Sequence, residues 1–348
     1  MKEIMEDLTR RDFIKGVVGA SISLVAADSM ASVAPDRVKN INPYQAKGLP
    51  LTELGSTGMQ IPKMVLGLGS RFCHIEDKEE SSEMLNYALD NGLYYWDTAH
   101  IYDNTIALPP GKTKSTKHII SEIRVGEVVK YRRKEIFLST KVTARDPAEA
   151  IKEIEDSLKR LNTDKLDMLK VHSVESIEDV DQMSKKGHLI DILHRLKEEG
   201  ITRFIGFSGH GDAYALKEMA NRGSFDSMLV AMNHWGPNSP SPREEEAVSA
   251  GKKNKMGILL MKAVRPKELI PGLQAPELVR YAMSLEGPDA VVIGMDSKAV
   301  VDSNLDILRN FKKLSPERMK ELAVKLQPFY HHENLPWMQD HYIDGMWG

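Results

Sequence analysis

Short runs of apolar, β-branched and aromatic residues alternate with helical patterns along most of this chain. A strand that is followed each time by a helix is typical of parallel strands joined by helical crossovers. In a closed barrel of such strands, all C-terminal strand ends lie on one face, where distant residues meet. The eight strands are expected at residues 63–68, 93–97, 135–140, 165–171, 202–207, 226–232, 257–262 and 289–293, with clear helical periodicity at 148–161 and 189–200.

Four ionisable residues lie at or just past the ends of three of these runs: Asp97, Tyr102, Lys141 and His172. An ammonium group such as that of Lys141 would stabilise the phenolate of Tyr102 and lower the pKa of the phenol. The carboxylate of Asp97 would keep Lys141 charged in an apolar barrel, and a neutral His172 would orient a substrate oxygen. This set suits proton transfer at a carbonyl oxygen, and the accompanying hydride requires a nicotinamide because no side chain supplies one.

Each of these residues alone has an ordinary structural explanation. An Asp at a strand end is usually a cap or a turn former, and a single Tyr, Lys or His is more often packed or solvated than functional. The occurrence of all four in order, each beside a predicted strand, favours a shared site over four unrelated roles.

The segments around these residues resemble the aldo-keto reductase superfamily over about residues 50–310. The resemblance implies a (β/α)8 TIM barrel that uses NAD(P)(H) to transfer a hydride between nicotinamide and an aldehyde, ketone or sugar. It also implies a catalytic tetrad of Asp97, Tyr102, Lys141 and His172, with Tyr102 as general acid or base. The similar segments are TELGSTGMQIPKMVLGLGS (52–70), YYWDTAHIYDN (94–104), IFLSTKV (136–142), LDMLKVHS (166–173), GITRFIGFSGH (200–210) and VVIGMDSKAVVDSNL (291–305).

The same resemblance assigns cofactor contacts. Ser208 would bind the nicotinamide carboxamide together with Asn233, while Lys262 would reach a cofactor phosphate or the substrate. NADP is favoured over NAD because Lys298 could bind a ribose 2′-phosphate. No GxGxxG follows the first strand, which argues against a Rossmann domain. By resemblance, the adenosine half would be held by Gly294, Ser297 and Asn304.

Three further segments are expected to surround the barrel. Residues 50–62 have a hairpin pattern, and the family places such a hairpin at the bottom of the barrel. Residues 103–117 form a long connection after Tyr102 that either lines the substrate pocket or is a passive surface loop. The C-terminal tail, 331–348, covers the mouth in the family; its aromatic residues Trp337, Tyr342 and Trp347 either stack on a substrate or pack and cap.

Residues 1–31 resemble a twin-arginine signal peptide. Arg10 and Arg11 precede Phe13, and an apolar stretch follows that is too short for a permanent membrane span. Residues 32–49 are expected to be a linker, and 50–348 the barrel domain. The protein is therefore expected to engage the twin-arginine export machinery and to work in the periplasm.

Composition narrows the possible partners. A net charge of −3 gives no basic excess for nucleic acid, and the single cysteine, Cys73, excludes an intramolecular disulfide. No ligand spacing indicates a metal. Two alternatives to a reductase remain: an enzyme that retains its nicotinamide for a redox-neutral isomerisation, epimerisation or elimination of a sugar, and a redox-responsive nucleotide-binding module with negligible turnover.

Overall fold

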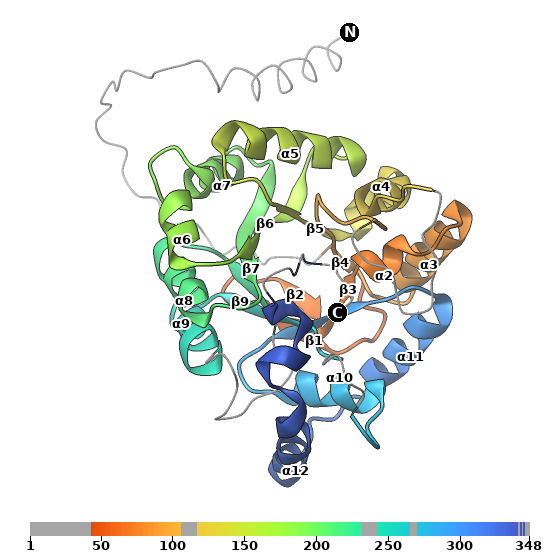
Figure 1. The fold of residues 1–348 in the computed structure, drawn as a ribbon. Coiled ribbons are helices and arrows are strands. Elements are labelled where there is room, and N and C mark those ends of the chain that lie inside the picture. The colour runs from red at the N-terminus through yellow and green to blue at the C-terminus, as the bar shows by residue number, and fades with distance from the viewer. Residues whose placement is uncertain are drawn as a thin grey trace, which may run out of the picture.

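A computed structural model describes residues 43–105, 117–231, 243–264, 270–339, 342 and 344. Within these residues, eight parallel strands pair side by side into a closed barrel, in the order β10-β3-β4-β5-β6-β7-β8-β9 (Figure 1). The expected (β/α)8 barrel is thus confirmed, with each strand close to its expected place. The strands are β3 (Met64–Gly67), β4 (Tyr95–Asp97), β5 (Phe137–Val142), β6 (Leu166–Val174), β7 (Thr202–Gly209), β8 (Ser227–Ala231), β9 (Gly257–Met261) and β10 (Ala290–Gly294).

Helices form a ring around this barrel (Figure 1). The start of α5 (Pro147–Arg160) is explained by its sequence. The side chain of Asp146 accepts hydrogen bonds from the first-turn amides, and Pro147 occupies the first turn. Gly200, with φ of +74°, follows α7 (Leu189–Glu198) in the left-handed conformation expected after a helix. The other helices are α2 (Ser70–Cys73), α3 (Lys78–Asp90), α4 (Ser121–Arg132), α6 (Ile177–Met183), α8 (Ala213–Arg222), α9 (Ser249–Lys253), α10 (Ala275–Ser284), α11 (Lys298–Arg309) and α12 (Pro316–Leu326), with short helical turns η1 (Arg133–Glu135), η2 (Arg243–Val248), η3 (Gln327–Phe329), η4 (His332–Asn334) and η5 (Pro336–Met338).

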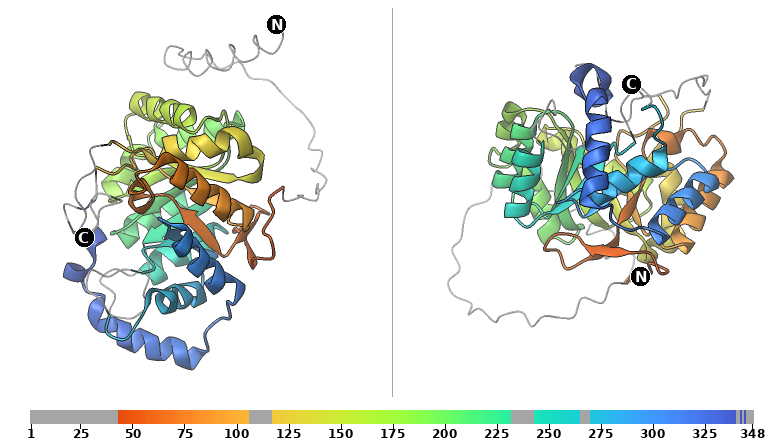
Figure 2. Two further views of the ribbon diagram at one scale, coloured as in Figure 1. Left: turned by 90° about the vertical axis from the view of Figure 1, so that its right-hand side faces the viewer. Right: turned by 90° about the horizontal axis from the view of Figure 1, so that it is seen from below.

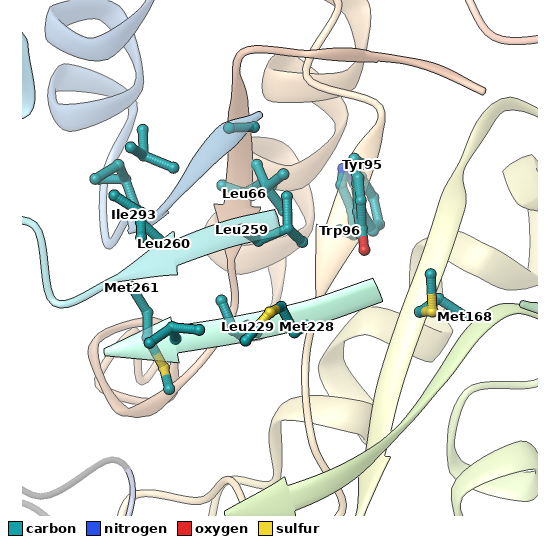
Figure 3. Packing of buried hydrophobic residues seen from close by; sticks show 14 of the residues in the cluster. Leu66, Tyr95, Trp96, Met168, Met228, Leu229, Leu259, Leu260, Met261 and Ile293 are labelled. Carbon is teal, nitrogen blue, oxygen red and sulfur yellow. The ribbon is translucent and has the colours of Figure 1, made fainter. Parts of the chain in front are cut away.

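The barrel changes from apolar to ionisable along its axis. Leu66, Met228 and Leu259 are fully buried or nearly so in the core cluster drawn in Figure 3. Along β6, Met168 is followed two and four positions later by ionisable residues, and alternate residues of a strand share one face. The apolar layer therefore supports a polar layer at the C-terminal strand ends, where screening by water is weak.

The expected hairpin is confirmed at the opposite end of the barrel. Strands β1 (Leu51–Glu53) and β2 (Gln60–Pro62) pair antiparallel, and Figure 2 shows them below the barrel in its right-hand view. The amide of Gly55 donates to Asp289 Oδ2 over 3.2 Å, just before β10 begins. The hairpin thus closes the N-terminal ends of the strands.

The tail returns to the barrel after α12. Trp337 is only 4% exposed and belongs to the core cluster. Of its two expected roles, packing is therefore the one that its burial supports, and no face of the ring is exposed for stacking. Trp347, residues 1–42 and residues 106–116 of the long connection lie outside the described residues. Across the described chain, no helix is both long and apolar enough to cross a membrane.

Gly55 provides a test of how the hairpin is seated. Its φ is +50°, and an added Cβ would lie 2.2 Å from the backbone nitrogen of Gly257, whereas Gly48 has φ of +81° with nothing within 4 Å. We expect Gly48→Ala to cost roughly 1–2 kcal/mol of unfolding free energy from backbone strain alone. Gly55→Ala should cost clearly more because β9 must also move. Urea denaturation measures both, and equal losses would contradict this seating.

Candidate active site

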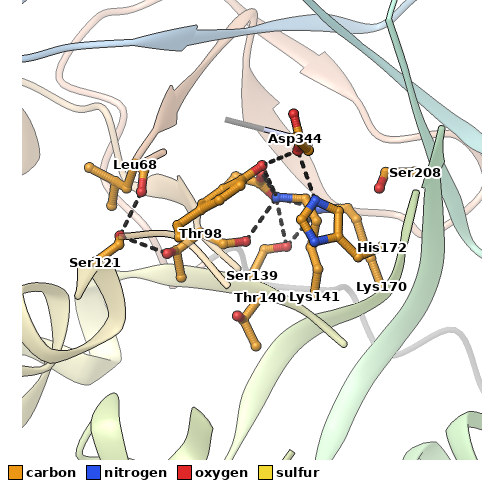
Figure 4. Close-up of polar contacts among 12 residues, drawn as sticks. Leu68, Thr98, Ser121, Ser139, Thr140, Lys141, Lys170, His172, Ser208 and Asp344 are labelled. Carbon is orange, nitrogen blue, oxygen red and sulfur yellow. Dashed lines mark hydrogen bonds and ion pairs between the residues drawn. The ribbon is translucent and has the colours of Figure 1, made fainter. Parts of the chain in front are cut away.

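The four ionisable residues converge at the C-terminal strand ends. Asp97 ends β4, Lys141 lies in β5, His172 lies in β6, and Tyr102 is in the connection after β4. The ammonium group of Lys141 donates to Asp97 Oδ2 over 2.6 Å and lies 3.4 Å from the hydroxyl of Tyr102. The ring of Tyr102 meets that of His172 edge to face, with centroids 5.4 Å apart. The structure thus brings together all four predicted site residues. Figure 4 shows this part of the barrel, with Lys141 and His172 labelled.

Asp97 is shared between two lysines. Lys170, from the middle of β6, donates to Asp97 Oδ1 over 2.7 Å while Lys141 holds Oδ2, and all three side chains are buried. Burial alone would raise the pKa of Asp97, but the two ammonium groups lower it to about 2. The pKa of Lys141 is lowered by burial and by Lys170, against the attraction of Asp97. Two cations with one carboxylate leave an excess positive charge beneath the site.

A carboxylate from the C-terminal tail occupies the centre of the site. Asp344 Oδ2 accepts hydrogen bonds from the Tyr102 hydroxyl over 2.6 Å and from His172 Nε2 over 2.8 Å. Its Oδ1 lies 3.0 Å from His210 Nε2 and 2.8 Å from Lys262 Nζ. Asp344 is buried, so the tail covers the mouth here as expected. Its Oδ2 stands where a substrate oxygen would meet Tyr102 and His172.

Both histidines around Asp344 are neutral donors. Burial lowers the pKa of His172, and burial lowers that of His210 to about 4. The Nδ1 atom of His172 faces the hydroxyl of Thr143 at 3.4 Å, and that of His210 faces Ser173 at 3.2 Å. With Nδ1 accepting from these hydroxyls, each ring carries its proton on Nε2 and donates it to Asp344.

The expected low pKa of Tyr102 is wrong for this structure. Burial, followed by the charges of Asp344 and Asp97, holds the pKa of the phenol well above its ordinary value of 10.0. Burial disfavours the charged phenolate, and the negative charge of the carboxylate to which the hydroxyl donates further favours the protonated phenol. Lys141 lies close enough to stabilise the phenolate, but burial and the tail carboxylate outweigh it.

The predicted cofactor residues are placed at three locations. Ser208 is buried in β7, where its hydroxyl accepts from the amide of Ser173 over 3.0 Å. Lys262 follows β9 and joins the cluster around Asp344 instead of an isolated phosphate position. Asn233 lies outside the described residues.

The remaining predicted cofactor residues lie around the start of α11. Gly294 ends β10, and Ser297 caps α11 by accepting from the amide of Val300. Asn304 is buried and donates to the carbonyl of Val300 over 2.9 Å, so its amide already serves the helix. Lys298 is exposed, and its Nζ atom lies 4.8 Å from the centre of the Tyr87 ring.

Sequence reasoning missed three functional candidates. Lys170 lies two residues before His172 on the same strand face, so the period of two could have identified it. His210 closes a motif that was assigned to cofactor binding only through Ser208. Asp344 carries no local signal, because only the path of the folded tail brings it to the strand ends. Among the described residues, no group of three His, Cys, Asp or Glu could hold a metal ion.

The fold is a (β/α)8 barrel with a cluster of buried ionisable side chains at its mouth. The family model described as "Aldo/keto reductase family" matches residues 63–265, and the chain belongs to this family of nicotinamide-dependent oxidoreductases. L-galactose dehydrogenase from Arabidopsis thaliana is 24% identical over 83% of this chain and 97% of its own length. The uncharacterized oxidoreductase YqkF from Bacillus subtilis is 29% identical over 45% of this chain, a match that spans 47% of that relative.

A solved structure shows the same fold. The holo form of aldo-keto reductase AKR11C1 from Bacillus halodurans superposes with a TM-score of 0.62 at 20% identity, covering 80% of this chain and 96% of that chain. At this identity the likeness concerns the barrel architecture and not the individual site residues.

The charge balance around Asp97 is testable by substitution. Asp97→Asn leaves two buried ammonium groups without their carboxylate, and we expect a loss of about 3–5 kcal/mol in unfolding free energy. Lys170→Met should cost clearly less, because the pair of Asp97 and Lys141 remains neutral overall. Urea denaturation at pH 7 compares the two variants. Equal losses would show that Lys170 is needed as a packing element and not as the surplus charge.

The buried neutral histidines predict acid sensitivity. Between pH 6.5 and about 4, the unfolded chain binds a proton that folded His210 does not. Stability should therefore fall as the pH drops through this window, with His210 contributing up to roughly 3 kcal/mol. Urea denaturation at several pH values measures the slope. His210→Gln should flatten it, whereas substituting the exposed His331 should not, and an unchanged slope in His210→Gln would contradict a neutral buried ring.

Proposed function

We propose that this protein transfers a hydride between a nicotinamide and a carbonyl or alcohol substrate, with Tyr102 as general acid and base. One observation carries the proposal: the Tyr102 hydroxyl and His172 Nε2 both donate to the same oxygen, Asp344 Oδ2. A carbonyl oxygen at that position would receive a proton from Tyr102 while His172 orients it. The dehydrogenase name of the Arabidopsis relative supports chemistry between CH–OH and C=O.

The buried cations give Tyr102 the means to act in both directions. Once the phenol has released its proton, Lys141 at 3.4 Å would stabilise the phenolate. Asp97 holds that ammonium group in place, and the carbonyl of Thr98 accepts from it over 2.8 Å. With two fixed acceptors for Lys141, the cation keeps its position throughout the reaction.

The site residues move protons only, so the hydride must come from a bound nicotinamide, which supplies it from its reduced ring. The buried hydroxyl of Ser208 and the first turn of α11, where the amide of Val300 donates to Ser297, would contact a carboxamide and an anionic phosphate respectively. Gly294, Ser297, Asn304 and Asn233 would complete that binding. NADP is preferred over NAD if Lys298 moves from the Tyr87 ring to a ribose 2′-phosphate.

We infer that the protein is exported in folded form and works in the periplasm. The inference is supported by the Arg pair, Phe13 and the apolar stretch within residues 1–31, followed by small residues at which cleavage is plausible. A twin-arginine route would let the barrel bind its cofactor in the cytoplasm before transport. Replacing Arg10 and Arg11 by Lys should retain the protein in the cytoplasm, as fractionation would show.

Tyr102→Phe tests the assignment directly. We expect carbonyl reduction to fall by about 10²–10⁴-fold, because the proton donor is lost, while nucleotide affinity stays nearly unchanged. Single-turnover oxidation of NADPH measures the first quantity, and quenching of its fluorescence measures the second. Tyr131→Phe, at an exposed position, is the matched control. Full turnover in Tyr102→Phe would reject the role.

The purified wild-type protein can be used to distinguish a reductase from the two alternatives, a redox-neutral sugar enzyme and a nucleotide-binding module. Mass spectrometry of molecules released on denaturation identifies the nucleotide, and added labelled nucleotide tests whether it exchanges. Retention without exchange would favour a redox-neutral sugar conversion. Tight nucleotide binding with no hydride transfer to aldehydes, ketones or sugars would favour a binding module.

A further inference from the structure

The carboxylate of Asp344 has two oxygens in two different environments. Oδ2 occupies the position of the reacting oxygen beside Tyr102, whereas Oδ1 is held at a second position that the reaction itself does not require. At this second position, Lys262 Nζ, His210 Nε2 and the hydroxyl of Tyr342 lie 2.8, 3.0 and 3.1 Å from Oδ1. We call the side chains of Lys262 and His210 the second oxygen site.

The backbone of Lys262 and the ring of His210 are held by their surroundings. Lys262 has φ of +67°, a left-handed backbone that is uncommon for a non-glycine residue and that clusters at binding sites. His210 is held by Ser173 at its Nδ1, and its carbonyl accepts two hydrogen bonds from the buried guanidinium of Arg243. A backbone and a ring placed in this way are typical of a site that recognises an oxygen at a defined position.

The positive charge of the surrounding lysines favours an anion at the position of Asp344 Oδ1. Among the described residues of the site, three ammonium groups pair with two carboxylates: Lys262 with Asp344, and Lys141 and Lys170 with Asp97. If a neutral carbonyl compound took the place of Asp344, Lys262 would lose this carboxylate, while Lys141 and Lys170 would still share Asp97. An incoming carboxylate restores the balance, because it replaces the charge that Asp344 removes. The cations are Lys141, Lys170 and Lys262.

We propose that the substrate is a 2-oxo acid, or the corresponding 2-hydroxy acid in the reverse direction, and that its carboxylate takes the place of Asp344 Oδ1 at the second oxygen site. The neighbouring carbonyl oxygen then lies at the Oδ2 position. This rests on the proposed function of the same site. The flexible stem of Lys262 accommodates the one extra carbon between the two oxygens.

The chemistry balances with the groups already named. The carbonyl carbon gains a hydride from the reduced nicotinamide, the C=O π bond breaks, and the oxygen takes the proton of Tyr102. The carbonyl compound is reduced to an alcohol and the nicotinamide is oxidised. The carboxylate stays ionised and unchanged beside Lys262, which distinguishes recognition from reaction.

Binding of unreactive analogues tests this inference without any hydride transfer. Oxamate carries a carboxylate next to an amide carbonyl, and oxamide is its neutral counterpart. Calorimetry on the full-length protein should show that Asp344→Ala binds oxamate at least tenfold more tightly than wild type, because the competing tail carboxylate is gone. Oxamide should gain far less. Glu333→Ala, an exposed acidic residue of the same tail, should leave both affinities unchanged.

Removing the cation of the second oxygen site should reverse the gain. In the Asp344→Ala background, Lys262→Met should lower oxamate affinity at least tenfold and leave oxamide unaffected, whereas Lys313→Met at an exposed position changes neither. If Asp344→Ala fails to fold, Asp344→Asn keeps the shape of the side chain and gives the same comparison. Equal binding of oxamate and oxamide, no gain on removing Asp344, or tight oxamate binding without Lys262 would each overturn the proposal.

These outcomes are separate from those that test the proposed function. Oxamate binding needs no nucleotide and no proton transfer, so it can succeed while Tyr102→Phe retains turnover. Conversely, a loss of turnover in Tyr102→Phe together with indifference to the ligand carboxylate would leave a reductase of neutral carbonyl compounds.

Discussion

The buried carboxylate of Asp97 is the interaction on which the upper half of the barrel depends. It is enclosed by apolar residues below and strand backbone around it, and it binds Lys141 and Lys170 at once. A single carboxylate cannot neutralise two ammonium groups, and little water is present to screen the remainder. The two lysines therefore outnumber the carboxylate that binds them, which favours negatively charged groups nearby.

The C-terminal tail brings a second carboxylate, that of Asp344, to the same end of the barrel. Asp344 comes from outside the barrel, yet its pKa is well below the ordinary value, because Lys262 and the histidine hydrogen bonds overcome the cost of its burial. A carboxylate held this firmly is a structural element as well as an occupant of the site. The same carboxylate therefore buries its charge beside Lys262 and occupies the position next to Tyr102 and His172.

Much of the fold could be predicted from the sequence because its signals are local. The eight strands, the hairpin and Gly200 after α7 each have a pattern of neighbouring residues that identifies them. The convergence of Asp97, Lys141 and His172 followed from the geometry of a parallel barrel. The identity of the charge beside Tyr102 could not be predicted, because Asp344 is 242 positions away along the chain. The wrong expectation for the phenol pKa arose from the burial of the hydroxyl and from that missing long-range contact.

In the proposed reaction, the occupant of the site would control where the proton of Tyr102 resides. With the tail carboxylate in place, burial and the negative charges of Asp344 and Asp97 raise the pKa of the phenol and keep it protonated. A substrate carbonyl oxygen would be a weaker acceptor until hydride transfer, when it would become an alkoxide and take the proton. Lys141 would then stabilise the phenolate that remains, without any rearrangement of Asp97. The structure with Asp344 in place therefore holds Tyr102 in the protonated form that the proposed reductase would need at the start of its cycle.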